Sequence, residues 1–577
     1  MIKKLSKSIR DALPFAIVTP LLCTGEVVLE VLIPMVLADI IDNGISAGSM
    51  SYILRRGILM LTLAMLSLLF GALSGRTAAL GSARFARNLR HDMFYTIQDY
   101  SFSNIDKFST SSLVTRLTTD VNNVQISYQM LTRIAMRCPL ILIAALVMAF
   151  RVNSEVAMIF VFALPLLAIG LTLVFRLAHP HFKKVFSEYD NLNNVVQENL
   201  QGIRVVKSFV REDYEISKFT KVSKKIYDGF TKAEGIAAFN GPILQFVVYA
   251  CMLLISWFGA HLIVGGTMST GDLMSFITYA MMMLMSLNML AMVMVMITIS
   301  GSSAERIVEV LEEKSTLSNC ENPVYEIPDG SVDFNHVNFS YAGRMDKLCL
   351  KDVDIHIRSG QTVGILGGTG SSKSSFVQLI PRLYDVTEGS VYIGGRDVRE
   401  YDLDALRENV AMVLQKNVLF SGTIRENLCW GNKEATDEQI REVCRLACAD
   451  EFIERFPHKY DTYIEQGGTN VSGGQKQRLC IARALLKKPK ILILDDSTSA
   501  VDTKTDAAIR SALREFLPET TKFIIAQRIS SVQDADVIIV MDNGQIHGVG
   551  THEELLASND IYREVYESQN KEAKSNG

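Results

Sequence analysis

Residues 361–376 read QTVGILGGTGSSKSSF, and this stretch decides the fold of the second half of the chain. The apolar run Thr362–Leu366 predicts a short buried strand, which a glycine-rich turn joins to a helix that opens at Lys373. This form approximates the phosphate-binding pattern G-x-x-x-x-G-K-[ST], in which backbone N–H groups and a helix N-terminus face the phosphates of a nucleotide. Lys373 would supply a positive charge for the outer phosphates, and the hydroxyl of Ser374 would reach Mg²⁺.

One position of the loop departs from the pattern, because Ser372 stands where the second required glycine is expected. A side chain there is expected to crowd the backbone or to strain its dihedral angles. The residues of the loop that we expect to contact the nucleotide are Gly367, Gly368, Thr369, Gly370, Ser371, Ser372, Lys373, Ser374 and Ser375.

Two further stretches downstream complete a pattern. Residues 490–496 read KILILDD, which predicts a buried strand with Asp495 at its end, where the carboxylate would hold Mg²⁺ through water. Residues 470–485 read NVSGGQKQRLCIARAL. Together these motifs resemble the nucleotide-binding domain of ATP-binding-cassette (ABC) transporters, whose signature is similar to Ser472, Gly473, Gly474 and Gln475.

The resemblance implies further contacts with ATP. Tyr341, in VNFSYAG, matches the aromatic residue that stacks on adenine. Gln415, in MVLQKNVLFSGTIREN, matches the glutamine that senses the γ-phosphate and Mg²⁺ and touches the membrane domain. Residues 499–502 match the family's D-loop, which ends at Asp502. The expected cofactors are therefore ATP and Mg²⁺, with Ser374, Gln415 and Asp495 near the metal.

Two catalytic positions depart from the family. Asp496 stands where the family has the glutamate that polarises the attacking water, and such a shorter side chain can cost on the order of 10²-fold in rate. Gln527, in KFIIAQRIS, replaces the switch histidine and carries no positive charge. We expect Asp496, Gln527 and Gln415 to be the catalytic residues of a weakened site. The alternative is that these residues are tolerated variants of a competent site.

The signature segment is intact, and this asymmetry has a consequence. In the family, ATP lies between the phosphate loop of one cassette and the signature of the other. We therefore expect a heterodimer with a second, non-identical half-transporter, in which this chain's signature completes the partner's catalytic site. Hydrolysis is then expected mainly at the partner's site, while the chain's own ATP site is degenerate.

The first half of the chain is strongly apolar. Hydrophobic residues make up 48% of the 577 residues, and the apolar runs concentrate before residue 300. A membrane-spanning helix needs about 20 mostly apolar residues. The stretches that meet this criterion are 13–42, 56–80, 133–151, 155–177, 241–265 and 272–299, of which the third and fourth form a tight hairpin.

Two long polar segments, 81–132 and 178–240, separate the spans and are rich in lysine and arginine. The positive-inside rule therefore places both segments, both termini and the C-terminal half in the cytosol. Their helical period predicts stalks that extend the spans beyond the membrane. By resemblance, Ser109–Arg116 and Gln197–Lys207 would couple these stalks to the cassettes.

The expected fold is that of a multi-domain membrane protein. It combines an all-α, six-helix transmembrane domain at 1–310, a linker at 311–325 and an α/β P-loop ATPase domain at 326–577. We expect a multi-pass protein of the bacterial plasma membrane, in contact with the lipid bilayer. The net charge of −4 gives no indication of nucleic-acid binding, and the nine cysteines follow no metal-binding spacing.

Two groups of side chains in the spans are candidates for binding cargo. Glu26 and Glu30 lie four residues apart in the first span, where acidic groups are costly and often functional. The alternative is a structural pair with Arg133 or Arg137, or hydration in a wide cavity. The last span carries flexible methionines along one face, which would line a cargo cavity or fill the core: Met281, Met285, Met289, Met292 and Met296.

The sequence thus predicts a subunit that exports drugs or other amphipathic small molecules with energy from ATP. Three alternatives stay open: an importer built on the exporter fold, an exporter of lipids or peptides, and a subunit that mainly binds ATP for regulation.

Overall fold

The computed structural model describes residues 2–496 and 501–575, which form two compact units. The first unit contains the chain up to Gln98 together with Thr110–Glu313. The second contains Asp99–Ser109 together with the chain from Lys314 onward. A short segment inside the expected membrane domain at 1–310, Asp99–Ser109, thus packs with the second unit.

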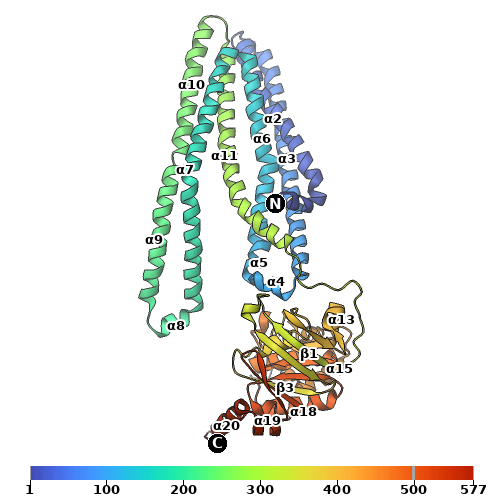
Figure 1. Cartoon of the computed structure of the whole chain (residues 1–577). Helices are drawn as coiled ribbons and strands as arrows, with labels where there is room; N and C mark the ends of the chain where they lie inside the picture. The colour runs from blue at the N-terminus through green and yellow to red at the C-terminus, as the bar shows by residue number, and fades with distance from the viewer. Residues whose placement is uncertain (1, 497–500, 576–577) are drawn as a thin grey trace. The chain divides into compact units, whose positions relative to one another are not determined.

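The first unit is built from long helices (Figure 1). Its main helical segments are α1 (Ile2–Leu5), α2 (Leu13–Asp39), η3 (Ile40–Ile45), α3 (Met50–Gln98), α5 (Thr110–Thr115), η4 (Arg116–Asp120), α6 (Val121–Val152), α7 (Ser154–Gln201), α8 (Ile203–Ser208), α9 (Glu212–Ala237), α10 (Asn240–Val264) and α11 (Thr270–Glu312).

Within the described residues, six helical stretches are long and apolar enough to cross a membrane, which confirms the six predicted spans. The 49 residues of α3 correspond to roughly 74 Å of helix, more than twice the apolar thickness of a bilayer. Many large apolar side chains of these helices are exposed in the isolated chain, as expected for surfaces that face lipid or another subunit. The chain is therefore a multi-pass membrane protein.

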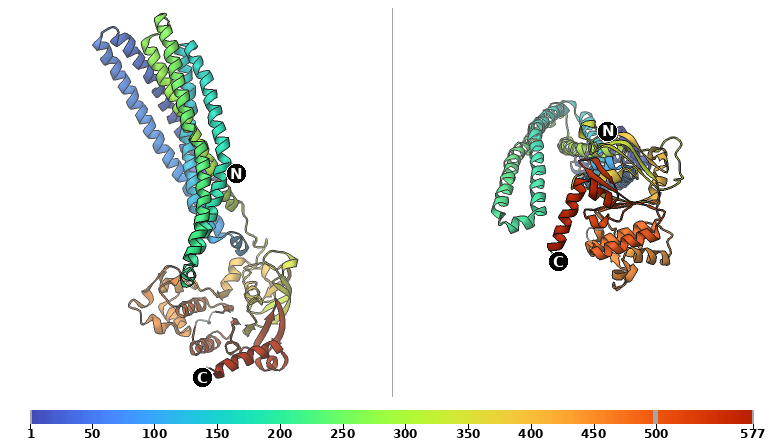
Figure 2. Two further views of the ribbon diagram at one scale, coloured as in Figure 1. Left: turned by 90° about the vertical axis from the view of Figure 1, so that its left-hand side faces the viewer. Right: turned by 60° about the horizontal axis from the view of Figure 1, so that its bottom comes forward.

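The predicted hairpin between the third and fourth spans turns at Asn153. This residue ends α6 and caps α7, where its side-chain oxygen accepts a hydrogen bond of 2.9 Å from the backbone N–H of Glu155. Beyond the spans, α7 and α9 lie side by side and are joined by α8 (Figures 1 and 2). A small apolar cluster of Val185, Val195, Val222 and Ile226 holds this pair together.

The second unit has two principal sheets. The larger has the strand order β12-β11-β3-β10-β9-β6, with β12 antiparallel and the other neighbours parallel. The smaller is antiparallel, with the order β2-β1-β4-β5. The strands are β1 (Val332–Phe339), β2 (Leu350–Ile357), β3 (Thr362–Leu366), β4 (Glu388–Ile393), β5 (Arg396–Asp397), β6 (Val410–Val413), β7 (Gly422–Thr423), β8 (Tyr463–Ile464), β9 (Ile491–Asp495), β10 (Thr521–Ile525), β11 (Val537–Asp542) and β12 (Gln545–Gly550).

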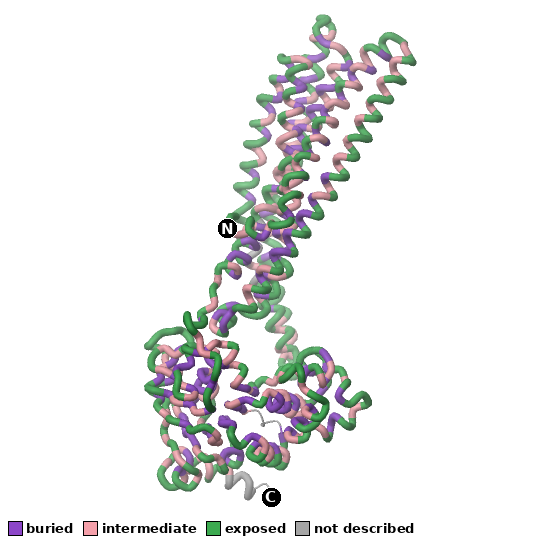
Figure 3. The backbone as a smooth tube through the Cα atoms, turned by 90° about the vertical axis from the view of Figure 1, so that its right-hand side faces the viewer, coloured by how far each residue is buried: buried purple, intermediate pink, exposed green. Residues whose placement is uncertain are grey.

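The unit also contains helices, and it encloses two apolar clusters. The helices are α4 (Phe102–Lys107), α12 (Lys373–Gln378), α13 (Leu403–Asn409), α14 (Ile424–Leu428), α15 (Asp437–Leu446), α16 (Asp450–Ile453), α17 (Gly473–Leu486), α18 (Thr503–Phe516), α19 (His552–Ser558) and α20 (Asp560–Ser575). Buried residues concentrate inside this unit, whereas they are more scattered along the long helices (Figure 3). The expected α/β ATPase fold is confirmed.

Helix α4 explains why residues 99–109 belong to the second unit. Its N-cap, Ser101, contacts the hydroxyl of Thr316 at 2.6 Å, and the side-chain amide of Asn104 donates to the carbonyl of Lys314 at 3.0 Å. The first of the expected coupling segments, Ser109–Arg116, follows α4 in the sequence. Helix α4 belongs to the second unit, whereas Thr110–Glu313 belongs to the first.

Candidate functional site

The phosphate loop lies between β3 and α12, as the sequence predicts. Gly367 has a φ of +159°, and a Cβ atom there would lie 2.3 Å from the carbonyl oxygen of Met541. Ser372 has a φ of +68°, in the left-handed region that normally favours glycine. This conformation costs a non-glycine residue roughly 1–2 kcal/mol. The expected strain at Ser372 is therefore present in the backbone.

The ammonium group of Lys373 folds back onto the loop. It donates to the carbonyl oxygens of Gly367 and Gly368, both at 2.8 Å, and to the hydroxyl of Ser371 at 3.2 Å. Burial lowers the pKa of Lys373, whereas the nearby carboxylates of Asp495 and Asp496 raise it. A phosphate would offer this ammonium a charged acceptor, which gives a stronger hydrogen bond than a neutral carbonyl.

Asp495 ends β9 and is buried, with 4% of its surface exposed. Burial, the largest cause, raises the pKa of Asp495, and the neighbouring carboxylate of Asp496 also raises it. A hydrogen bond with Ser374 and the positive charge of Lys373 lower the pKa of Asp495. The structure therefore brings the hydroxyl of Ser374 and the carboxylate of Asp495 together. Hard oxygen donors such as these suit Mg²⁺, which binds to one or two carboxylates together with phosphate oxygens. The donor set fits the predicted metal.

The side chains of Gln415 and Gln527 both reach a carboxylate oxygen of Asp496, so the three predicted catalytic residues lie together. The side-chain amide of Gln527 donates to Oδ2 of Asp496 at 3.0 Å, and the amide of Gln415 lies 3.5 Å from the same oxygen. Gln527 and Asp496 are separated by 31 residues in sequence. Asp496 itself has a φ of +46°, so its backbone is also strained. The two residues that differ from the family's catalytic residues, Asp496 and Gln527, are thus in direct contact.

Tyr341 lies beside the phosphate loop. Its hydroxyl is 2.9 Å from the hydroxyl of Ser375 and donates to the side-chain oxygen of Gln378 at 3.1 Å. The exposed fraction of Tyr341 is 47%, which leaves part of its surface accessible to a nucleotide base.

A cavity of about 640 Å³ joins these groups. Among the predicted residues, its lining includes Tyr341, Gly367, Gly368, Thr369, Gly370, Ser372, Lys373, Ser374, Ser375, Gln415, Asp495, Asp496 and Gln527. Ser371 is absent from the described lining, because its buried hydroxyl donates to the carbonyl of Gly368 at 2.8 Å.

The cavity also contains residues that the sequence analysis missed. They are Cys349, Leu366, Ile525, Ile561 and Val565. Ile561 and Val565 lie one turn apart on α20, near the end of the chain. Their apolar spacing is visible in the sequence, but only the fold places α20 beside the phosphate loop.

The signature segment lies at a different place in the same unit. Ser472 caps α17 and forms a reciprocal pair with Gln475, with backbone-to-side-chain distances of 2.9 and 3.3 Å. The described residues that line the nucleotide cavity do not include Ser472, Gly473, Gly474 or Gln475.

Asp502 caps α18, and its carboxylate accepts a hydrogen bond of 3.0 Å from the backbone N–H of Thr505. This hydrogen bond lowers the pKa of Asp502. Ser499 and Ala500, at the start of the predicted D-loop, lie outside the described residues.

The two acidic residues of the first span share one guanidinium group. Nε of Arg137 lies 3.3 Å from Glu26, and Nη2 lies 2.7 Å from Glu30. Arg133 instead donates to the carbonyl of Gly71 at 3.2 Å. The carboxylates therefore have a charged partner on α6, which favours the structural alternative over direct recognition of a cationic cargo.

The predicted methionines lie along α11, mostly on its accessible side. Met281, Met285, Met289 and Met292 are exposed and Met296 is half-buried, whereas Met283 is fully buried. A separate apolar cavity of about 560 Å³ lies between α7 and α10. The described residues that line this cavity include Phe162, Phe246 and Phe258. None of the predicted cargo residues is among them.

Comparisons with known proteins agree with this architecture. Residues 17–287 match the ABC transporter transmembrane region, and residues 350–499 match the ABC transporter domain. The chain is 36% identical over 549 residues to the uncharacterized ABC transporter ATP-binding protein YfiB of Bacillus subtilis (strain 168), and the match covers 95% of each chain. It is 34% identical over 466 residues to the probable multidrug resistance ABC transporter ATP-binding/permease protein YheI of the same organism, covering 80% of this chain and 79% of YheI.

The fold is similar to that of a solved bacterial Atm1-family ABC exporter with ATP bound. The TM-score is 0.81 at 24% identity, and the match covers 97% of this chain and 98% of the exporter chain. The six apolar helical stretches among the described residues and the α/β ATPase unit lie in one chain. The chain therefore belongs to the ABC transporter family, as a half-transporter of the exporter type.

Proposed function

We propose that this chain is the degenerate-site subunit of a heterodimeric ABC exporter in a bacterial plasma membrane. The observation that carries the proposal is the hydrogen bond of 3.0 Å between Gln527 and Asp496. A general base must reach the attacking water with a free carboxylate oxygen in a suitable position. Asp496 is one methylene shorter than glutamate, and its Oδ2 accepts from Gln527 instead of facing a charged switch residue.

The site retains what is needed to bind ATP. Lys373 supplies positive charge, Ser374 and Asp495 supply oxygen ligands for Mg²⁺, and Tyr341 supplies an aromatic surface for the base. Binding and slow turnover are therefore expected together, because removal of a well-placed base reduces the chemical step more than it reduces affinity.

The signature segment supports a different role. Its reciprocal cap leaves the N-terminus of α17 ordered, and Ser472–Gln475 would complete a competent site on the partner. ATP binding would then join the two cassettes and bias the membrane domain from an inward-open to an outward-open state, and hydrolysis at the partner's site would reset it.

For the cargo, we propose drugs or other amphipathic small molecules. The exposed methionines of α11 form an adaptable apolar surface, and the relative YheI is named a probable multidrug resistance transporter. We also propose that residues 1–310 form the transmembrane domain, apart from the docking segment at 99–109, and that residues 326–577 form the ATPase domain. Both termini are proposed to be cytosolic.

The test is to purify the chain alone and together with the half-transporter encoded by a neighbouring gene, both in lipid nanodiscs. The chain alone is expected to bind ATP but to hydrolyse it slowly, and the pair is expected to hydrolyse it at least about ten times faster. A chain that hydrolyses ATP as fast alone as in the pair would contradict the proposal. Uptake of a fluorescent amphipathic dye by inside-out vesicles would then test the direction of transport.

A further inference from the structure

A chain of aromatic rings leads from the nucleotide cavity to helix α4. The ring of Tyr341 meets that of Tyr384 edge-on, with centroids 5.1 Å apart and planes at 89°. Tyr384 in turn lies 6.1 Å from the ring of Phe102, which is the first residue of α4. Phe339, at the end of β1, contacts both tyrosines at 4.8 and 5.7 Å. All four residues belong to the second unit.

A hydrogen bond reinforces the last step of this chain. The hydroxyl of Tyr384 donates to the carboxylate of Asp106, also on α4, at 2.6 Å. Burial raises the pKa of Tyr384, and the bond with Asp106 raises it further, so the phenol remains a neutral donor at physiological pH. Tyr384 therefore holds α4 at two points, through its ring and through its hydroxyl.

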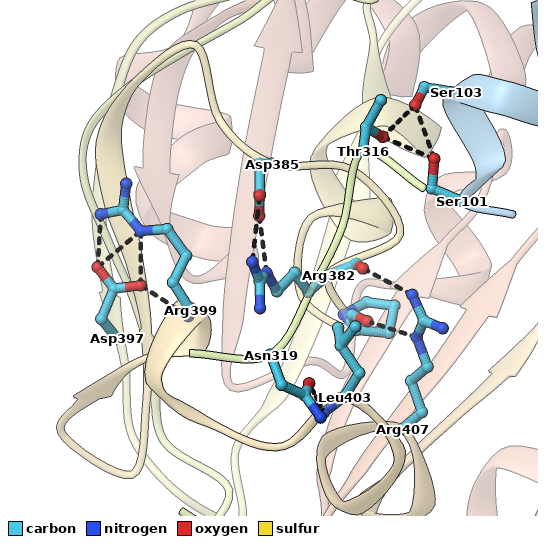
Figure 4. Close-up of polar contacts among 11 residues, drawn as sticks. Ser101, Ser103, Thr316, Asn319, Arg382, Asp385, Asp397, Arg399, Leu403 and Arg407 are labelled. Carbon is cyan, nitrogen blue, oxygen red and sulfur yellow. Dashed lines mark hydrogen bonds and ion pairs between the residues drawn. The ribbon is translucent and has the colours of Figure 1, made fainter. Parts of the chain in front are cut away.

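Arg382 and Asp385, which lie on either side of Tyr384 in the sequence, contact each other (Figure 4). Arg382, which is 5% exposed, forms two hydrogen bonds of 2.7 and 3.2 Å with Asp385. Arg407 donates to the carbonyl of Arg382 at 3.0 Å. These contacts restrain the side chains on either side of Tyr384 and the backbone carbonyl of Arg382 before it.

The N-terminal end of α4 is also restrained. Ser101 and Ser103 both contact the hydroxyl of Thr316 at 2.6 Å, in the segment that follows α11 (Figure 4). Among the described contacts, Tyr384 links the ring of Tyr341 to α4. The ring centroids of the two tyrosines are 5.1 Å apart, which is closer than the 6.1 Å between Tyr384 and Phe102.

We propose that Tyr384 is a positioning residue that makes the docking of α4 depend on the nucleotide base stacked against Tyr341. The inference rests on the proposed ATP site. A base that stacks on Tyr341 fixes the orientation of its ring, and an edge-to-face partner is sensitive to that orientation. The base and α4 then stabilise one another, since coupling between two sites is reciprocal.

The role differs from that of the phosphate-sensing residues. The side chains of Gln415 and Gln527 contact Asp496, whereas Tyr341 contacts α12 through Ser375 and Gln378. A ligand with phosphates but no base offers the ring of Tyr341 no stacking partner, so it should act on the tyrosine path less than ATP does. An aromatic contact of this kind corresponds to a change of about two- to tenfold in an equilibrium constant.

The experiment compares ATP with inorganic tripolyphosphate, both with Mg²⁺, on the full-length chain in lipid nanodiscs. Amide hydrogen exchange of residues 102–107 is the readout, and displacement of a fluorescent ATP analogue measures occupancy. At equal occupancy, ATP is expected to slow exchange in this segment about two- to tenfold more than tripolyphosphate does.

Three variants test the residue itself. Tyr384→Leu is expected to abolish the difference between the two ligands, and Tyr384→Phe to reduce it by removing only the hydrogen bond to Asp106. Tyr325→Leu is the matched control, because Tyr325 is a tyrosine of the same unit that is 67% exposed, and it should leave the difference unchanged.

Equal protection by ATP and tripolyphosphate in the unmodified chain would overturn the inference. So would a ligand difference that persists in both Tyr384 variants. If Tyr384→Leu also loses tripolyphosphate binding, the fold of the site is damaged and the Tyr384→Phe result decides. Failure of ATP to displace the analogue from the unmodified chain would instead contradict the proposed ATP site.

Discussion

Serines precede α12 and α17 of the ATPase unit, and these two serines have opposite backbone conformations. Ser372 precedes α12 with a φ of +68° and makes no side-chain cap. Ser472 precedes α17 with a φ of −70° and a ψ of 161°, and it forms a capping box with Gln475. Both lie in short segments rich in glycine and serine, so composition alone does not distinguish them.

The difference shows where this unit stores strain. A phosphate loop must turn successive N–H groups inward, which requires left-handed backbone at Gly370 and at Ser372. A capped helix start has extended backbone and satisfies its own N–H groups. The strained start therefore belongs to the side proposed to hold this chain's own nucleotide, and the relaxed start belongs to the side proposed to serve the partner.

The largest expected effect concerns Gly367. Gly367→Ala should reduce the free energy of unfolding by about 3 kcal/mol, because its Cβ would meet the carbonyl oxygen of Met541 at 2.3 Å. Thermal unfolding of the purified chain measures the loss. Gly368→Ala is the matched control, since a Cβ there meets nothing within 4 Å. Equal losses in both variants would show that the strain is not confined to the position at which β3 enters the loop.

The next effect concerns catalysis. Asp496→Glu combined with Gln527→His should raise the ATPase rate of the chain alone by about 10- to 100-fold, because it restores the longer base and a group able to carry charge. Steady-state phosphate release measures the rate. Each single change serves as a control and should give a smaller gain. No gain in the double variant would place the weakness elsewhere, with Ser372 as the remaining departure.

We expect substitutions of Ser472, the N-cap of α17, to have an intermediate effect on stability. Ser472→Ala should lower the free energy of unfolding by about 1 kcal/mol, whereas Ser472→Gly should lower it by only a few tenths. Neither change should alter the affinity of the chain's own site for ATP, because Ser472 does not line the cavity. Thermal unfolding and displacement of a fluorescent ATP analogue separate the two properties. A loss of affinity in either variant would contradict the separation of the two segments.

The smallest effect concerns the strained start. Ser372→Gly should raise the free energy of unfolding by less than about 1 kcal/mol, because relief of the left-handed strain is partly offset by the greater freedom of glycine in the unfolded chain. Chemical denaturation compares it with Ser472→Gly, which should change stability in the opposite direction. A loss of stability in both variants would remove the contrast between the two serines.

The sequence by itself determined the ABC transporter architecture. Six apolar stretches, the buried strands Thr362–Leu366 and Ile491–Asp495, and the ordered motifs between them are local patterns, each read within a short window. The strain at Ser372 was also predictable, because the phosphate loop requires glycine-like backbone at that position.

Only the tertiary structure decided which distant side chains meet. Gln527 and Asp496 contact each other because β10 and β9 are parallel neighbours, and Arg137 reaches Glu26 and Glu30 because α6 packs against α2. Helix α4 joins the ATPase unit through Tyr384, which is 278 residues from Asp106. No local periodicity encodes these contacts, because each depends on how whole strands and helices pack.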